Sequence, residues 1–175
     1  KRQLPLFIFS LFLFFVTIRD FFGKNINISQ KISHFGFSLL ILSILLNGVL
    51  AKEHSSNMRV GDEIKFLDKI IQFQNIEVIK KQNYQTLIGK FNIVDEDNSL
   101  SLKPEIRIYD QPETITSEAD ISSTIFADNF LVFNIIKNDG FYNVRYQIKP
   151  FMIWIWISVL LISLGGILSL KKKNV

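Results

Sequence analysis

The sequence contains no cysteine and only two histidines, His34 and His54. Without a thiol the chain can form no disulfide, no cysteine nucleophile and no cysteine-ligated zinc or iron–sulfur centre. It also has no glycine-rich phosphate loop, no catalytic triad and no evident pair of catalytic carboxylates. These absences leave the two imidazoles as the side chains best suited to bind a metal or act as a base.

Charge is missing from two stretches, residues 32–51 and 150–170, which contain no Asp, Glu, Lys or Arg. An uncharged apolar run of about 20 residues is long enough to cross the ~30 Å hydrocarbon core of a bilayer as a helix. Hydrophobic residues make up 48% of the chain, so these runs account for much of its apolar content. A wholly soluble, disordered or fibrous protein is therefore excluded.

A third, shorter apolar run occupies Leu4–Ile18, and Arg19 can extend it by snorkelling toward the head groups. Because the chain starts at Lys1 and this run follows almost at once, we expect the sequence to be the end of a longer protein. The predicted organisation has two transmembrane helices in residues 1–51, at about 4–22 and 32–51, joined by a cytoplasmic loop; a β-rich domain at 52–149; and a C-terminal transmembrane helix with a basic cytoplasmic tail at 150–175.

The charged residues divide sharply along the chain. Residues 52–149 carry 12 basic and 15 acidic side chains, a net charge of −3, whereas the rest carries 8 basic residues and one acidic residue, a net charge of +7. Basic residues that flank membrane spans favour the cytoplasmic side. Here Arg19, Lys24, Lys31 and the run Lys171–Lys173 agree on one side, and they outnumber Lys1 and Arg2, which fall on the other side. The segment 52–149 is therefore predicted to be extracytoplasmic, and nucleic acid is not an expected partner.

The segment 52–149 alternates short β-branched and aromatic runs with turn residues, which is typical of β-structure. The expected strands are 64–67, 70–73, 76–79, 86–94, 106–109, 130–136 and 142–148. Turns are expected at Asp95–Ser99, Gln111-Pro112 and Asn138–Gly140. The fold class is thus an integral membrane α-helical protein with about three transmembrane helices and an inserted extracytoplasmic antiparallel β domain, a small barrel or sandwich.

His34 lies near the start of the second predicted span. An ionisable side chain inside a membrane helix is costly and usually faces protein, a cavity or a cofactor, and a neutral imidazole suits axial binding of haem iron. The residues alone leave two interpretations open: a haem ligand, or an interfacial histidine that hydrogen-bonds a neighbouring helix. On the same span, Ser33, Gly36, Ser43 and Asn47 form a stripe at helical spacing that predicts close helix packing.

His54 follows the second span and is expected in a solvated loop. It is 20 residues from His34. That separation is about 30 Å along a continuous helix, so the two imidazoles cannot share one iron unless the helix breaks. Trp154 and Trp156 are expected to anchor the third span at the membrane interface. Gly165-Gly166, further along the same span, is expected to permit close contact with another helix.

Several short segments, taken in order, resemble the C-terminal region of the CcmF family of cytochrome c-type biogenesis proteins. They are His34-Phe35-Gly36, Arg59–Asp62, Asn83-Tyr84, Pro104–Tyr109, Gln111-Pro112 with Thr114, Glu118 and Ala119, Val144-Arg145, Lys149–Phe151, Trp154–Trp156 and Leu164–Gly166. Each is weak alone, but their order and spacing from about residue 30 to 170 make the match specific. The sequence departs from the family pattern at Ser33, Phe35 and Gln82.

The resemblance implies a haem lyase subunit of the cytochrome c maturation system, which attaches haem delivered by the haem chaperone CcmE to the thiols of apocytochrome c. Further maturation subunits such as CcmH are implied partners. The family resembled carries a membrane-embedded haem b held by two histidines from separate spans, and His34 matches the more C-terminal of these ligands to the haem iron. Ser38, one turn away, is a candidate to orient the ring.

The implied location is the bacterial inner membrane, with a multi-pass chain and its β domain in the periplasm, or alternatively the mitochondrial inner membrane. The family's Trp-rich haem-handling segment and its other histidines have no counterpart here, so no catalytic residue is assigned and the second haem ligand would come from outside this chain. A competing hypothesis is a non-catalytic, membrane-tethered β-module that acts as an assembly scaffold, in which His34 is incidental.

Overall fold

The computed structural model describes residues 4–23, 26–95, 98–136 and 140–172, and these fall into two compact units. The first, the helical unit, takes in residues 1–51, 123–128 and 149–175. The second, the sandwich unit, takes in residues 52–122 and 129–148. The β domain is therefore inserted between the second and third helices of the chain.

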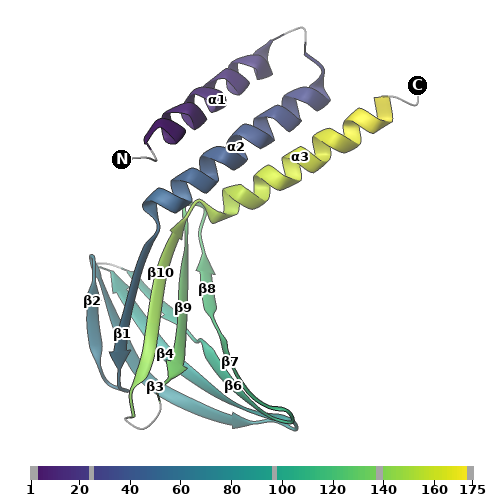
Figure 1. The fold of residues 1–175 in the computed structure, drawn as a ribbon. Helices are drawn as coiled ribbons and strands as arrows, with labels where there is room; N and C mark the ends of the chain where they lie inside the picture. The colour runs from purple at the N-terminus through teal and green to yellow at the C-terminus, as the bar shows by residue number, and fades with distance from the viewer. Residues whose placement is uncertain (1–3, 24–25, 96–97, 137–139, 173–175) are drawn as a thin grey trace. The chain divides into compact units, whose positions relative to one another are not determined.

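The helical unit contains α1 (Leu4–Phe22), α2 (Ile28–Leu50) and α3 (Met152–Lys172), shown in Figure 1. All three are long and apolar enough to cross a membrane, as the sequence predicts. The second helix begins at Ile28 and not at residue 32, because the polar residues Ser29, Gln30 and Lys31 form its first turn. The Nζ of Lys31 donates to the carbonyl of Gly23, directly after α1, which ties together the two ends of the α1–α2 connection.

The first two helices pack through aromatic rings and one buried hydroxyl pair. The ring of Phe35 lies 5.6 Å from that of Phe14 and 6.1 Å from that of Phe21. Between the same helices, Thr17 Oγ1 and Ser38 Oγ are 2.6 Å apart and buried. Because an unpaired hydroxyl in an apolar environment is costly, this pair fixes how α1 and α2 meet.

The small residues of α2 face α3, as the sequence predicts. A methyl group added at Gly36 would lie 2.9 Å from Leu161 Cβ, and one added at Gly165 would lie 2.8 Å from the carbonyl oxygen of Ser29. Only glycine permits such close approach of two helix backbones. At one end of the pair, Asn47 Nδ2 donates to the carbonyl of Pro150 over 2.6 Å, so the end of α2 is joined to the residues that precede α3.

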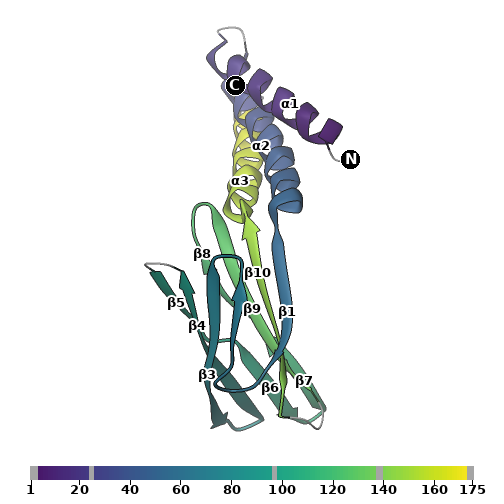
Figure 2. The same cartoon turned by 90° about the vertical axis from the view of Figure 1, so that its left-hand side faces the viewer.

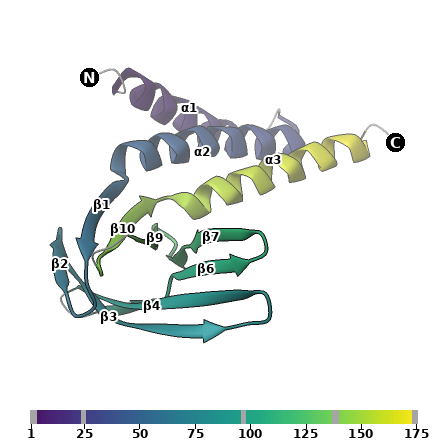
Figure 3. The ribbon, with the colours of Figure 1, turned by 60° about the horizontal axis from the view of Figure 1, so that its bottom comes forward.

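The sandwich unit is built from ten strands, counted over the described residues. They are β1 (Lys52–Met58), β2 (Glu63–Phe66), β3 (Lys69–Lys80), β4 (Tyr84–Asp95), β5 (Asn98–Leu102), β6 (Glu105–Asp110), β7 (Glu113–Glu118), β8 (Asp120–Ser123), β9 (Ala127–Ile135) and β10 (Tyr142–Pro150). One sheet has the order β1-β10-β9-β8 (Figure 2). The other has the order β2-β3-β4-β6-β7, with β5 paired to β4 (Figure 3). The predicted antiparallel β domain is thus confirmed as a sandwich.

The strand boundaries differ from the prediction in two ways. The expected strands 70–73 and 76–79 are one strand, β3, because a bulge between Phe73 and Asn75 shifts its register against β4 without ending it. Strands β1, β5, β7 and β8 were not predicted. The expected turns at 95–99 and 138–140 include residues 96–97 and 138–139, which lie outside the described part of the chain.

The core of the sandwich unit lies between its sheets and is rich in aromatic side chains. Phe73 and Phe91 stack with ring centres 4.3 Å apart, and Phe133 meets the ring of Phe91 edge-on at 5.7 Å. The remaining buried residues of this cluster are Met58, Ile71, Ile93, Leu102, Ile106, Leu131, Val144 and Tyr146. Burial raises the pKa of Tyr146 to about 12, and its hydroxyl donates to Asn129 Oδ1 over 2.5 Å.

Candidate functional site

His34 lies on the face of α2 that neither α1 nor α3 covers. Its side chain is exposed, and so are those of Phe37 and Ile44 further along the same face, at 54% and 51%. Residues 34, 37, 44 and 48 fall within one side of a helix of 3.6 residues per turn. The buried residues Gly36, Leu39 and Ser43 point to the other side. The imidazole therefore faces outward from the three helices, among apolar side chains.

The imidazole of His34 makes no hydrogen bond with any other residue that the structure describes. The interpretation of His34 as an interfacial histidine that hydrogen-bonds a neighbouring helix is therefore not supported within the described residues, because neither α1 nor α3 supplies a partner for it. Ser38, the candidate for orienting the ring, has its hydroxyl engaged elsewhere: it donates to the carbonyl of Phe35 over 2.9 Å and pairs with Thr17. The sequence could not reveal this, because Thr17 comes from a different helix.

His54 lies in strand β1 and not in a solvated loop, which corrects the prediction. Its ring stacks on that of Phe66 with the centres 5.2 Å apart, and across the sheet it is paired with Tyr146. The residue is half-buried at the edge of the sandwich core. The sequence does not predict this strand because β1 is almost entirely polar. Its residues are Lys-Glu-His-Ser-Ser-Asn-Met, and only Met58 is fully buried. The contacts of His54 are those of a packing residue.

The two histidines belong to different units, and no group of three or more His, Cys, Asp or Glu side chains that could hold a metal occurs among the described residues. A metal bound by this chain alone is therefore not supported by a ready-made set of ligands. A single imidazole on an otherwise apolar helix face could supply one ligand to a metal held in a large, apolar group. Haem is such a group.

Residues that carry the family resemblance gather on neighbouring strands of the larger sheet. Tyr84 pairs with Tyr109, and Thr86 pairs with Arg107, across β4 and β6. The two tyrosine rings are 5.2 Å apart. Lys81 lies 5.3 Å from the centre of the Tyr84 ring, and its interaction with Tyr84 raises the pKa of Lys81. The sequence does not predict this arrangement, because residues of β4 and β6 are far apart along the chain and are brought together only by the register of the strands.

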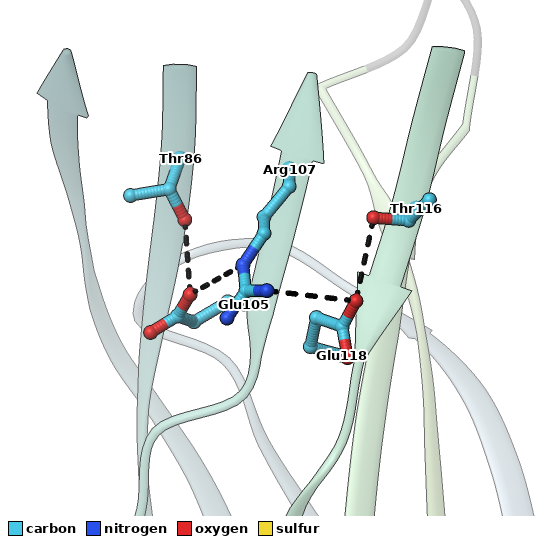
Figure 4. A network of polar contacts seen from close by, with 5 residues as sticks. All are labelled: Thr86, Glu105, Arg107, Thr116 and Glu118. Carbon is cyan, nitrogen blue, oxygen red and sulfur yellow. Dashed lines mark hydrogen bonds and ion pairs between the residues drawn. The ribbon is translucent and has the colours of Figure 1, made fainter. Parts of the chain in front are cut away.

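The guanidinium of Arg107 lies 5.9 Å from the centre of the Tyr84 ring. Figure 4 shows that this arginine lies between two glutamates. Arg107 Nε is 3.1 Å from Glu105 Oε2, and Arg107 Nη1 is 3.8 Å from Glu118 Oε1. Thr86 Oγ1 donates to Glu105 Oε2 over 3.3 Å, and Thr116 Oγ1 donates to Glu118 Oε1 over 3.5 Å. Hydrogen bonds to Glu105 and then to Tyr109 raise the pKa of Arg107. The charges therefore pair with one another across neighbouring strands and form a polar surface.

The segment Arg59–Asp62 of the resemblance forms a tight turn between β1 and β2. The backbone amide of Arg59 donates to Asp62 Oδ2 over 2.7 Å, and Gly61 has a φ of +95°, which side-chain-bearing residues rarely adopt. The guanidinium of Arg59 lies 4.0 Å from the centre of the Phe141 ring. These residues shape the sandwich and give no sign of chemistry.

The tryptophans that open the third span differ in their surroundings. Trp156 is 66% exposed, as suits a side chain at a membrane surface. Trp154 is half-buried, and its indole Nε1 donates to the carbonyl of Ile125 over 2.9 Å. The partner of Trp154 comes from the connection between β8 and β9, which sequence reasoning did not single out.

These features define a class of protein: a membrane protein with three candidate membrane-spanning helices and an antiparallel β-sandwich inserted before the third. The chain belongs to the CcmF family, because residues 49–150 match the family model described as the CcmF C-terminal beta-sandwich. The predicted resemblance is thereby confirmed.

Individual proteins agree with this assignment. The chain is 24% identical over 146 residues to the cytochrome c-type biogenesis protein CcmF of Pseudomonas aeruginosa, covering 83% of this chain and 22% of that protein. It is 29% identical over 149 residues to the cytochrome c-type biogenesis protein ccl1 of Rhodobacter capsulatus, with the same two shares. The chain thus spans about a fifth of the length of these relatives.

A solved structure shows the same fold. The cytochrome c haem lyase CcmF superimposes with a TM-score of 0.66 and covers 94% of this chain and 29% of that one, at 15% sequence identity. At this identity the likeness establishes the arrangement of helices and strands, including the inserted sandwich. The curated relatives are named as cytochrome c-type biogenesis proteins.

Proposed function

We propose that this chain acts in a cytochrome c maturation haem lyase, where α2 supplies His34 as one axial ligand of a haem b. The observation that carries the proposal is the position of His34 on the outward face of a candidate membrane helix, without a hydrogen-bond partner among the described residues. A neutral imidazole with a free ring nitrogen is the usual axial ligand of haem iron. The opposite ligand would come from a helix outside this chain.

The neighbours of His34 suit the same role. Phe37 and Ile44 continue an apolar surface from His34 toward the C-terminal end of α2, and no charged side chain lies on this face between residues 32 and 50. Such a surface suits a large apolar group and excludes water from it. When bound, the haem would supply an iron that changes oxidation state. The residues of this chain would hold it and exclude solvent from it.

We further propose that the sandwich lies on the outer side of the membrane, where haem would pass from the haem chaperone CcmE to apocytochrome c with maturation subunits such as CcmH. The basic residues at the opposite ends of the helices support this orientation. Strands β4, β6 and β7 offer an ordered polar and aromatic surface around Arg107 that suits a protein partner.

The proposal is tested by replacing His34 in the full-length protein. We expect His34→Ala to lower bound haem b several-fold, measured as pyridine haemochrome per mole of folded protein purified in detergent. Two variants serve as controls. Val49→Ala removes an exposed aliphatic side chain at the other end of α2, and His54→Ala removes the other histidine, so both should retain haem close to the wild-type level.

Wild-type haem content in a folded His34→Ala protein would contradict the ligand assignment and favour the second candidate, a β-module that acts as an assembly scaffold. That candidate has some support, because the described residues contain no group of three or more His, Cys, Asp or Glu side chains that could hold a metal, and the charges around Arg107 pair with one another. A scaffold role predicts that His34→Ala leaves both haem content and cytochrome c maturation unchanged. The same experiment therefore separates the two functions.

A further inference from the structure

The connection between β8 and β9 belongs to the helical unit, although it joins two strands of the β-sandwich. Two hydrogen bonds hold it at the start of α3. The backbone amide of Phe151 donates to the carbonyl of Phe126 over 2.8 Å, and the indole of Trp154 donates to the carbonyl of Ile125 over 2.9 Å. The position of residues 125 and 126 is therefore fixed relative to the first turn of a candidate membrane span.

The connection is also held by hydrogen bonds of its own and presents its apolar side chains outward. Thr124 and Ala127 close a tight turn: the amide of Thr124 donates to the carbonyl of Ala127 over 3.0 Å, and the amide of Ala127 donates to Thr124 Oγ1 over 3.0 Å. At the tip of this turn Ile125 is 60% exposed and Phe126 is 72% exposed. The backbone carbonyls of the tip residues are occupied by α3 and the residue before it, and their side chains are free.

We propose that Ile125 and Phe126 form an interfacial anchor that inserts into the head-group and upper acyl region of the bilayer beside the start of α3. Residues 123–127 carry no charge, and α3 begins at Met152, one residue after the amide that binds Phe126. The side chains are thus presented at the level where an apolar span enters the membrane. Exposed aromatic and aliphatic residues at this level are stabilised by insertion to a depth of ~5–10 Å.

Trp154 indicates the depth at which the anchor lies in the membrane. Tryptophan prefers the membrane–water interface, where its ring is buried and its N–H finds a polar partner. Here the partner is the carbonyl of Ile125, so the indole and the tip of the turn share one level. Two neighbouring large apolar residues on a tied turn differ from the isolated exposed side chains that are normal on protein surfaces. This inference does not rest on haem binding by His34.

The test measures where residue 126 lies in a bilayer. The full-length protein, with its other cysteines replaced by serine, receives a nitroxide label through Phe126→Cys or Ile125→Cys and is reconstituted into phosphatidylcholine–phosphatidylglycerol vesicles. We expect the label at either position to be several-fold more accessible to molecular oxygen, which partitions into lipid, than to a water-soluble nickel chelate. Ile115→Cys is the matched control, because Ile115 is 59% exposed but lies on β7 in the sandwich unit.

The label at residue 115 should be more accessible to the nickel chelate. Equal preference for the nickel chelate at residues 115, 125 and 126 would overturn the proposal. A label at 125 and 126 that is immobile and reached by neither reagent would also overturn it and would assign the turn to a contact with another protein segment. Since the readout is position in the membrane and not haem content, its failure would leave the haem proposal untouched.

Discussion

At the scale of single residues, the two adjacent glycines of α3 differ completely in their surroundings. A methyl group on Gly165 would overlap Ser33 Oγ and would lie 2.8 Å from both the carbonyl oxygen of Ser29 and the amide nitrogen of Ser33. The serine hydroxyl could rotate, but the two backbone atoms could move only with α2 itself. We therefore expect Gly165→Ala to destabilise the helical unit by about 1–3 kcal/mol through overpacking. Thermal denaturation of the full-length protein in detergent measures the effect.

Gly166 supplies the matched control for this prediction. Nothing lies within 4 Å of a methyl group built there, so Gly166→Ala should denature at or slightly above the wild-type temperature, because alanine favours the helix. Adding Ser33→Ala to Gly165→Ala should not restore stability, since the backbone contacts remain. Equal stability of the two alanine variants would mean that α2 and α3 do not meet as closely as the structure has them.

In the sandwich core, Gly89 in β4 resembles Gly165 in leaving no room for a methyl group. A methyl group there would lie 2.7 Å from Phe91 Cε2 and 3.0 Å from Phe133 Cζ, both on buried rings. We expect Gly89→Ala to lower the free energy of unfolding by about 1–3 kcal/mol. In a Phe133→Leu background, where one of the rings is gone, the same substitution should cost less. A double-mutant cycle measures that coupling, and strict additivity would contradict the proposed clash.

The sequence predicted parts of the candidate site and missed others for identifiable reasons. His34 can be singled out because a histidine in an apolar helix is conspicuous, and its role as a haem ligand stays a prediction. The small-residue stripe through Gly36 was identified by its helical period. The bond between Ser38 and Thr17 was missed, because helical period says nothing about which neighbour covers each side. The Trp154–Ile125 bond was missed as well, since the two residues are 29 positions apart.

At the scale of elements, the helices were predicted well and the strands less evenly. Each helix is a continuous apolar run, which composition alone reveals. The strands that were found contain buried β-branched or aromatic residues, such as β4 and β10. Strands β1 and β7 were missed because they are mostly polar and exposed, and their strand structure comes from pairing with β10 and β6. Pairing between distant segments leaves little trace in local sequence.

The bulge in β3 explains why this single strand was predicted as two strands. Ile71 and Phe73 are buried, while Ile76, just past the shift, is only half-buried. The alternation that identifies a strand is lost where the register shifts, so a single strand was interpreted as two. β3 is nevertheless one continuous strand, because Asn75 and the residues after it still pair with β4.

At the scale of the whole molecule, the charges and the helix pairing make one orientation in the membrane testable. The first turn of α2 carries Lys31, and α3 ends among the lysines at 171–172, so basic residues flank both helices at the ends that we assign to the cytoplasm. The opposite ends of α2 and α3 are joined through Asn47 and Pro150, next to which the acidic segment 52–149 begins and ends. The bias of basic residues toward the cytoplasm then predicts that this segment is external.

Cysteine labelling of the full-length protein in intact cells tests this orientation, since residues 1–175 contain no cysteine and any others can be replaced by serine. We expect a membrane-impermeant maleimide to label Ser99→Cys, which is exposed on β5, without permeabilisation. Asn27→Cys, an exposed position between α1 and α2, should be labelled only after the membrane is permeabilised. Labelling of both variants after permeabilisation is the control for accessibility. The reverse pattern in intact cells would place the sandwich in the cytoplasm, where it could not take part in haem attachment outside the membrane.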